Sequence, residues 1–172
     1  MGARGNVSRA RMCVPRICGC HDQESHVGSK RERVKVADKL EVGSQLAGGE
    51  KHISVETMRS YSGEKGIHAQ EDAGKETGLG GALVQGGQLV AYLNQMMTSN
   101  FGEAYLRGGD ISVSFIKPVR PGDVITTKGI VQEIQPEGAR SRVVCEVWLE
   151  NQAGEKTTVG TASAFRAGRA ED

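Results

Sequence analysis

Residues 86–100 read GGQLVAYLNQMMTSN, and the spacing of their apolar side chains decides the fold. Large apolar residues recur there one, three and four positions apart, the repeat of an amphipathic helix with one broad apolar face. Methionine at this spacing usually fills a core rather than binding a ligand. We therefore predict a central helix over residues 86–100. Its apolar positions are Leu89, Val90, Leu93, Met96 and Met97.

Four segments after this helix have the composition of β-strands. The last three are joined by QPEGAR and NQAGEK, which each hold a glycine and polar residues suited to a short hairpin loop. One long apolar helix followed by an antiparallel meander predicts an α+β domain whose sheet wraps the helix. The four predicted strands are Ile111–Phe115, Val124–Ile134, Arg142–Glu150 and Thr157–Arg166.

The segment before the central helix is predicted to hold two short elements and a loop. A short extended piece is expected near Val42–Gln45. Ser54 and Thr57 have the composition of a helix start, and the apolar residues that follow up to position 61 are spaced for one helical face. Residues 62–81 are rich in glycine and charge, which favours an irregular loop over a helix or strand.

Length and charge exclude several classes of protein. With 172 residues, of which 37% are hydrophobic, the chain suits one ordinary domain with a tail. Its net charge of +1 gives no bulk field that would attract nucleic acid or an anionic membrane. No apolar stretch approaches the roughly 18 residues that span a bilayer, and the N-terminus lacks the apolar run of a secretory signal. We predict a cytoplasmic protein.

The two ends of the chain are excluded from the predicted domain. Residues 1–33 are rich in Arg, Gly, Ser and Cys and show no periodicity. An Arg-rich, acid-poor start is typical of some transit peptides, but no amphipathic helix accompanies it, so a disordered extension or a misassigned start is an equal alternative. We predict a domain over residues 34–167, followed by a short tail at residues 168–172.

The four cysteines do not form a disulfide framework, because three lie in the N-terminal extension. Cys18–His21, with His26 nearby, has some metal-ligating character but lacks the paired CxxC spacing of a structural zinc site. Free thiols are the favoured interpretation for Cys13 and this cluster. Cys145 alternates with apolar neighbours, which favours a small core residue over a nucleophile.

Three blocks occur in order along the chain: YSGEKGIHAQEDAGKETGLGGALVQGG, ISVSFIKPVRPGD and NQAGEKTTVGTASAF. Together they resemble the MaoC-like hydratase/dehydratase family, whose members include R-specific enoyl-CoA hydratases. The resemblance covers residues 34–167 and is most specific in Phe115–Asp123. It implies a hot-dog fold, in which a curved antiparallel sheet wraps one long helix, and a homodimer. It also implies hydration of trans-2-enoyl thioesters of CoA or an acyl carrier, or the reverse dehydration, without metal or redox cofactor.

The family's acid/base motif, S-G-D-x-N-P-x-H, is altered in this chain. The matching run, residues 62–68, reads SGEKGIH. Glu64 stands where the family has its Asp and His68 where it has its His, with one residue fewer between them. The extra methylene of Glu gives about 1.5 Å of additional reach, which would offset the shorter loop. The resemblance thus implies that Glu64 and His68 are the catalytic pair.

The family's small-residue, His, Gly block corresponds to Val84–Gly86, with Gln85 in place of the histidine. A glycine at a helix start lets a ligand approach its backbone closely, and the helix dipole favours negative charge there. The resemblance implies that the N–H of Gly86 holds the thioester oxygen as it becomes enolate-like.

Four further residues are predicted to contact the substrate: Ser62, Gln85, Gly87 and Lys117. Lys117 is expected at the ligand entrance, flanked by Arg120 and Lys128, where a CoA phosphate would be attracted. Helix capping explains Ser62 equally well, and solvated strand ends are the default interpretation of the three cations.

Hydration needs a base that deprotonates the water attacking Cβ, an acid that protonates Cα and a hydrogen-bond donor that stabilises the enolate. His68 is the natural base, because imidazole changes charge near neutral pH. Two alternatives stay open. The shortened loop and Gln85 also fit a catalytically silent acyl-thioester-binding or partner subunit. A hot-dog thioesterase that uses Glu64 is weaker, because His68 and the PVRPGD turn fit the hydratase branch better.

Overall fold

A computed structural model describes residues 40–167 of the chain. The predictions for residues 1–33, including the metal alternative at Cys18–His21, and for residues 168–172 lie outside this range. The elements in chain order are β1 (Glu50–His52), α1 (Val55–Ser62), α2 (Glu71–Glu76), α3 (Gly86–Phe101), α4 (Glu103–Gly108), β2 (Asp110–Phe115), β3 (Val124–Glu137), β4 (Arg140–Glu150) and β5 (Lys156–Ala167).

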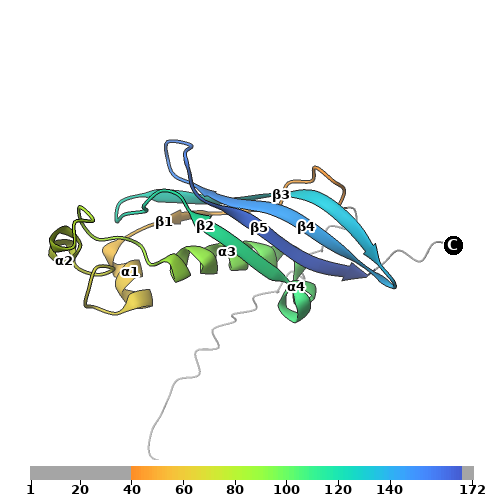
Figure 1. The fold of residues 1–172 in the computed structure, drawn as a ribbon, viewed down its shortest axis with the longest axis horizontal. Helices are drawn as coiled ribbons and strands as arrows, with labels where there is room; N and C mark the ends of the chain where they lie inside the picture. The colour runs from red at the N-terminus through yellow and green to blue at the C-terminus, as the bar shows by residue number, and fades with distance from the viewer. Residues whose placement is uncertain (1–39, 168–172) are drawn as a thin grey trace, which may run out of the picture. The chain divides into compact units, whose positions relative to one another are not determined.

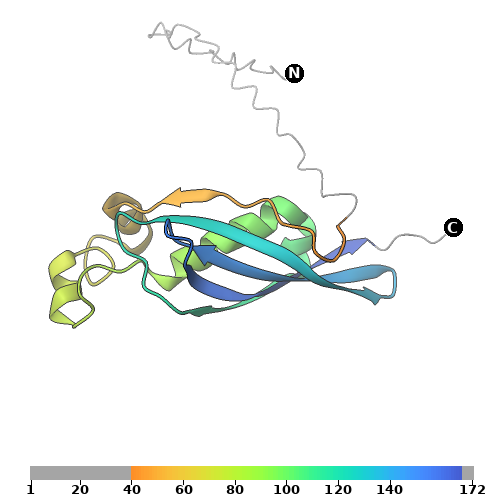
Figure 2. The same ribbon diagram turned by 90° about the horizontal axis from the view of Figure 1, so that it is seen from above.

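The five strands form one antiparallel sheet in the order β1-β3-β4-β5-β2. The predicted meander of β3, β4 and β5 is therefore confirmed. The strand that directly follows the helices, β2, lies at the edge beside β5, with Asp110 opposite Ser163 and Phe115 opposite Thr158. Figures 1 and 2 show the curved sheet lying across α3, so the predicted wrapping of the helix by the sheet is confirmed.

The central helix forms as predicted and is one residue longer than predicted, ending at Phe101. Its apolar face is buried against the sheet, and Leu93 and Met97 are 0% exposed. The two methionines belong to this core, as predicted, whereas Val90 is only half-buried. Full burial of one such side chain stabilises the fold by about 1.5–3 kcal/mol. The sheet therefore holds α3, and with it the start of the helix, in a fixed place.

Cys145 lies in the core on β4, where Val143, Val147 and Leu149 are buried on the same side of the strand. Burial raises the pKa of its thiol to about 12. Since the thiolate is the nucleophilic form of cysteine, this environment suits a packing role. The prediction of a core residue is confirmed.

Helix α1 starts where the sequence predicts. Ser54 and Thr57 form a capping box, in which the Ser54 side chain accepts from the Thr57 amide at 3.1 Å. Met58 points into the core and is 1% exposed. The helix ends at Gly63, whose φ of 85° places it in a region that favours glycine.

Three short elements differ from the predictions. The piece near Val42–Gln45 contributes only one bridge, from Gln45 to Ile130, and the first strand is β1 instead. Helix α2 lies inside the stretch predicted as an irregular loop, and α4 was not predicted. Both helices have six residues, less than two turns, so neither can display a helical repeat in the sequence. No helix within residues 40–167 is long and apolar enough to cross a membrane.

Candidate active site

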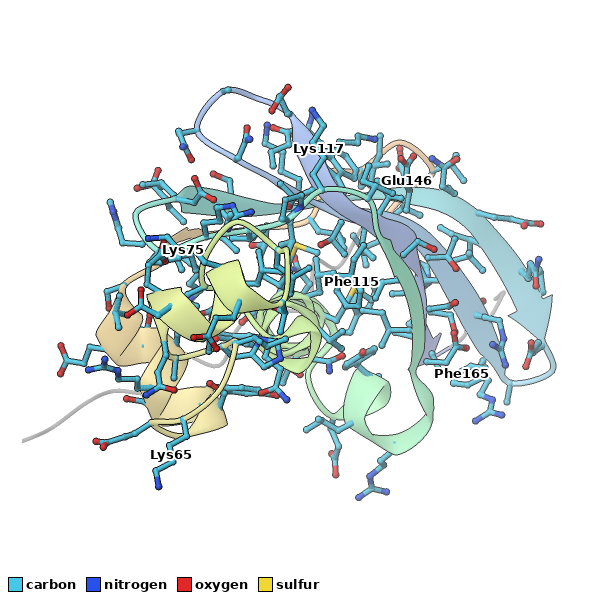
Figure 3. All side chains as sticks on the ribbon, turned by 60° about the vertical axis from the view of Figure 1, so that its left-hand side comes forward. Lys65, Lys75, Phe115, Lys117, Glu146 and Phe165 are labelled. Atoms are coloured by element: carbon cyan, nitrogen blue, oxygen red, sulfur yellow. The ribbon has the colours of Figure 1, made fainter. Side chains whose placement is uncertain are left out.

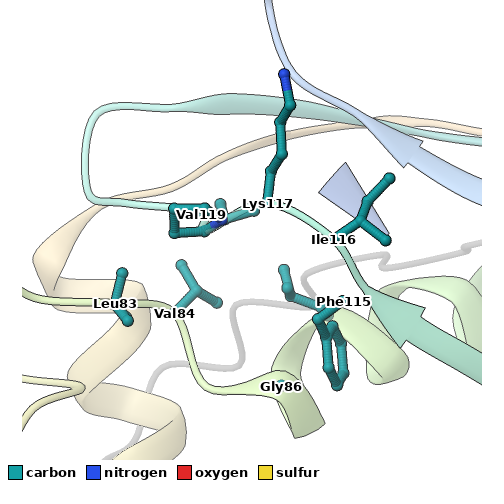
Figure 4. A pocket seen from close by; sticks show the side chains of 9 residues that line it. Leu83, Val84, Gly86, Phe115, Ile116, Lys117 and Val119 are labelled. Carbon is teal, nitrogen blue, oxygen red and sulfur yellow. The ribbon is translucent and has the colours of Figure 1, made fainter. Parts of the chain in front are cut away.

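A cleft of about 320 Å³ opens beside the first turn of α3 (Figure 4). All but one of its larger side chains are apolar, so its walls suit an acyl chain better than a charged ligand. Lys117 is the exception, and Figure 4 shows its side chain pointing away from Gly86. The lining residues are Leu83, Val84, Gly86, Leu89, Phe115, Ile116, Lys117, Pro118 and Val119.

The first two amides of α3 are unused within the described part of the chain. Gln85 is the N-cap residue, but its side chain makes no capping hydrogen bond. The first amide to bond into the helix is that of Gln88, which donates to the Gln85 carbonyl at 2.9 Å. The N–H groups of Gly86 and Gly87 have no acceptor among residues 40–167. Two free donors at the positive end of a 16-residue helix can stabilise an oxyanion.

Two aromatic side chains pack so closely on these glycines that no Cβ would fit. A Cβ on Gly86 would lie 2.8 Å from Cζ of Phe115, and a Cβ on Gly87 would lie 2.9 Å from the hydroxyl of Tyr61. Phe115 and Tyr61 are 51% and 49% exposed. The rings therefore flank the free amides from β2 and from α1, and glycine at both positions keeps the backbone accessible between them.

His68 is fixed by a backbone carbonyl of the cleft wall. Its Nδ1 lies 2.9 Å from the carbonyl oxygen of Leu83, which also lines the cleft. Because a carbonyl can only accept, Nδ1 must carry the hydrogen in this bond, and in the neutral ring Nε2 keeps a lone pair. His68 is half-buried. Its partner Leu83 precedes Val84 by one residue and Gly86 by three, and the neutral ring has the tautomer that a base at Nε2 requires.

Glu64 lies elsewhere. It is exposed and lines a separate hollow with Val55, Glu56, Arg59 and Ser60. No hydrogen bond joins its carboxylate to His68 within residues 40–167. Figure 3 shows Lys65, the next residue, pointing away from the sheet and from Phe115. The His68 ring is therefore bonded to Leu83, a residue of the cleft that also includes Gly86, whereas Glu64 lines a different hollow.

The predicted substrate contacts fall into two groups. Gln85 and Gly87 flank Gly86 at the helix start, where both are partly accessible or exposed. Ser62 is occupied with the backbone: its hydroxyl donates to the Met58 carbonyl at 2.8 Å and lies 3.5 Å from the His68 carbonyl. Ser62 thus ties the end of α1 to the loop that carries His68.

Lys117 forms an exposed ion pair with Glu155, with 2.7 Å between Nζ and Oε1. This hydrogen bond lowers the pKa of Glu155. Exposed ion pairs of this kind stabilise a fold little, because water screens the charges, so Lys117 can exchange its partner for another anion.

The other two cations near the predicted entrance are used structurally. Arg120 donates to the Leu79 carbonyl at 2.6 Å and to the Ala82 carbonyl at 3.5 Å. Lys128 pairs with Glu150. Solvated or structural strand ends describe these two residues better than a phosphate site does.

Sequence reasoning missed the cleft residues Leu83 and Phe115, and Tyr61 beside Gly87. Phe115 and Ile116 are large apolar residues at the end of an edge strand, and 51% and 53% exposure is high for such side chains. Phe115 lies inside one of the three blocks that carry the family resemblance, which was the available signal.

Comparison with known proteins places the chain among similar folds. A model of the family described as "MaoC like domain" matches residues 44–154. No curated protein matches the chain.

Solved structures similar to the chain share its fold at low sequence identity. The MaoC-like dehydratase from Rhodospirillum rubrum is 22% identical, with a TM-score of 0.65 over 76% of this chain and 94% of that one. The (R)-hydratase from A. caviae involved in PHA biosynthesis is 19% identical, with a TM-score of 0.61 over 77% and 100%. The HadBC (3R-hydroxyacyl-ACP dehydratase) complex from Mycobacterium tuberculosis is 14% identical, with a TM-score of 0.59 over 73% and 96%. The predicted hot-dog fold is confirmed.

Proposed function

This chain belongs to the MaoC-like domain family, whose model matches residues 44–154, and from this premise we propose that it hydrates trans-2-enoyl thioesters or runs the reverse dehydration. One observation carries the proposal. The Leu83 carbonyl, which lies 2.9 Å from Nδ1 of His68, belongs to a segment that leads into two helix-start amides with no acceptor among residues 40–167. A base beside an oxyanion site is the arrangement that this chemistry needs.

In the proposed reaction, Nε2 of His68 takes a proton from water as the water oxygen bonds to Cβ. The electrons of the Cα–Cβ double bond move to Cα, and through it onto the thioester oxygen, which becomes an enolate. The proton then passes from His68, through Glu64, to Cα, so no atom is lost and no external oxidant or reductant is used. A general base of this kind contributes about 10² to 10⁴-fold in rate.

The enolate oxygen would be held by the N–H of Gly86, with Gly87 beside it. Both donors lack acceptors among the described residues, and both sit where the helix dipole is positive. Removing one donor of a preorganised oxyanion site costs about 10² to 10³-fold in kcat. The apolar walls of the cleft would hold the acyl chain, and Gln85 would contact the thioester end.

We keep Glu64 in the proposal as the second proton-transfer group. Its loop is bounded by Gly63 and Gly66, with φ values of 85° and 93°, and its side chain is free in solvent. Substrate binding often tightens catalytic contacts, and in this proposal it brings Glu64 toward the cleft. Lys117 would leave Glu155 to bind a phosphate of CoA or of an acyl carrier, and Ser62 would support the His68 loop.

The direct test follows the loss of enoyl absorbance when the protein is mixed with short and medium trans-2-enoyl-CoA. Hydration by the parent and its loss in His68→Ala, with circular dichroism unchanged, would support the proposal. A His68→Ala variant that hydrates as fast as the parent would refute the assigned base. Glu64→Gln, run beside it, tests the second group.

A catalytically silent acyl-thioester-binding or partner subunit is the second candidate. The separation of Glu64 from the cleft and the presence of Gln85 favour it. Two similar structures are complexes of two different chains, ChsH1-ChsH2 and HadBC from Mycobacterium tuberculosis. Calorimetric binding of an acyl-CoA without turnover would favour this candidate. Release of free CoA thiol would instead indicate a thioesterase.

We further propose that the chain forms a homodimer in the cytoplasm. Within residues 40–167, edge strand β2 pairs only with β5, so its other edge is open. Phe115 and Ile116, at the end of β2, are 51% and 53% exposed. An open edge next to exposed apolar side chains is a surface that a second copy can cover.

A further inference from the structure

The segment Ala82–Val84 links the two halves of the proposed site through main-chain hydrogen bonds. The Leu83 amide donates to the Ile67 carbonyl at 3.1 Å, and the Leu83 carbonyl accepts from His68 at 2.9 Å. The Val84 amide donates to the Val119 carbonyl at 2.9 Å. The chain then passes directly into Gln85 and Gly86. A shift of this segment would therefore move both the histidine ring and the free amides.

One side chain holds an amide of this segment. Oε2 of Glu71, the first residue of α2, accepts from the Ala82 N–H at 3.0 Å. Among residues 40–167, no other side chain accepts from an amide of Ala82–Val84. This bond is also the main cause of the lowered pKa of Glu71, so the carboxylate is ionised when it holds the amide. A bond from an amide to a charged carboxylate is stronger than one between neutral groups.

The packing around this bond leaves little freedom. A Cβ on Gly81 would lie 2.5 Å from Oε1 of Glu71, and a Cβ on Gly74 would lie 2.0 Å from the Gly81 carbonyl oxygen. Two glycines thus let α2 approach the chain just before Ala82 closely enough for the carboxylate to reach. Gly81 has a φ of 134°, which a residue with a side chain rarely adopts.

Neighbouring charges do not replace this contact. Lys75 lies one turn along α2, 3.5 Å from Oε1 of Glu71 in an exposed pair. Arg120 donates to the carbonyls of Leu79 and Ala82, so it holds the loop before Ala82 and the carbonyl group of Ala82, but not its amide. Neither cation can accept the Ala82 amide hydrogen.

We propose that Glu71 is a positioning residue: by holding the Ala82 amide, it fixes the Leu83 carbonyl that sets the His68 tautomer and the path of the chain into Gly86. The catalytic meaning of this inference rests on the proposed hydration, whereas its geometry does not. Groups that hold a catalytic side chain through its neighbours decide whether the productive geometry is kept. A misplacement of about 1 Å can cost 10²-fold in rate.

The test reads the His68 ring directly by long-range ¹H–¹⁵N NMR, which reports which ring nitrogen carries the hydrogen. In the parent, the neutral ring should carry it on Nδ1. Glu71→Ala should release the ring into a mixture of tautomers. Glu71→Gln should restore the parent spectrum, because its amide oxygen can still accept from Ala82. Glu76→Ala, an exposed carboxylate on the same helix, is the matched control and should change nothing.

Kinetics supply the second readout. Glu71→Ala should lower kcat for enoyl-CoA hydration by about 10 to 100-fold, with KM changed by less than about twofold, because the apolar cleft walls keep their residues. Glu71→Gln should recover most of this loss. A merely structural role would lower the amount of folded protein without this split between kcat and KM.

Three outcomes decide the inference. A parent-like His68 spectrum in Glu71→Ala overturns it, whatever the activity. If Glu71→Ala fails to fold by circular dichroism, Glu71→Asp takes its place, since it keeps the charge but withdraws the carboxylate by about 1.5 Å. Mixed His68 tautomers in Glu71→Asp support the proposal, and a parent-like His68 spectrum in this variant overturns it. A parent without hydratase activity, whose His68 spectrum still responds to Glu71, supports the positioning and rejects the proposed function.

Discussion

At the scale of single residues, Gly86 has two tasks that a side chain would disturb. It offers a free amide at the start of α3, and it leaves room for the ring of Phe115. Neither task needs the backbone freedom of glycine, because Gly86 is not among the residues with positive φ. The lack of room for a side chain, not the backbone conformation, therefore explains the glycine at position 86.

Gly86→Ala should separate activity from stability. The new Cβ would lie 2.8 Å from Cζ of Phe115, and this half-exposed ring would turn into the cleft or across the free amides. We expect the rate of hydration to fall at least about tenfold. The free energy of unfolding should change by less than about 1 kcal/mol, since alanine is the better helix former. The double variant Gly86→Ala with Phe115→Ala should recover activity. Unchanged hydration in the single variant would contradict this role for the glycine.

Cys145 gives a second residue-scale prediction, on pH. Burial raises its pKa from the ordinary 9.0 to about 12. Between these values the unfolded chain loses this proton and the folded chain keeps it, so the contribution of Cys145 to stability falls as pH rises from about 9 to 12. At pH 8 iodoacetamide should leave Cys145 unmodified in the folded protein and modify it in urea, as measured by peptide mass mapping. Fast labelling of Cys145 in the folded protein would contradict its burial.

The candidate site shows where sequence reasoning at this scale ends. His68 and Gly86 could be predicted from a motif that keeps its residues in order. The hydrogen bond from the Ala82 amide to Glu71 could not be predicted. Its acceptor is a side chain, and its donor is a backbone amide eleven residues away that leaves no signal in the sequence. Likewise, the resemblance implies that Glu64 works with His68, but the sequence could not predict that the Glu64 side chain lines a separate hollow.

At the scale of elements, length decides what the sequence reveals. α3 and the strands of the meander span enough residues to display their repeats, and all were predicted within a few residues. β1 has three residues and α2 and α4 have six each, so tertiary packing rather than periodicity defines them. The capping box at Ser54 is the exception, because it marks the start of the eight-residue α1 by its own chemistry.

The buried face of α3 should carry a large share of the stability. Leu93 is 0% exposed in the middle of this face, so Leu93→Ala should lower the free energy of unfolding by about 2–5 kcal/mol through lost burial and a residual cavity. Gln95→Ala, exposed on the same helix, should change it by less than about 0.5 kcal/mol. Urea titration followed by circular dichroism measures both. Equal effects would contradict the assigned core face.

At the scale of the whole molecule, the described sheet has two edge strands, β1 and β2, and β2 is the one that ends beside the proposed site. Sedimentation equilibrium should give the mass of two chains. Ile116→Lys, at the end of β2, should shift the mass toward one chain, because a charge at this edge opposes pairing. Val42→Lys is the control: Val42 is 65% exposed beside Gly43, which bonds to Val131 on β3, and it should leave the dimer intact. One-chain mass for the parent at every concentration would contradict the proposed homodimer.

The same whole-molecule view gives the reason for the central claim: the sheet fixes α3, and the segment before α3 bonds to the proposed base, His68, and leads into the proposed oxyanion donors. The most direct test follows a trans-2-enoyl-CoA labelled with ¹³C at Cβ by NMR in deuterated water, with the intact protein. The account predicts that the alkene carbon becomes a hydroxyl-bearing carbon, with one deuterium at Cα and the thioester intact. An unchanged alkene, or free acid with released CoA, would contradict it.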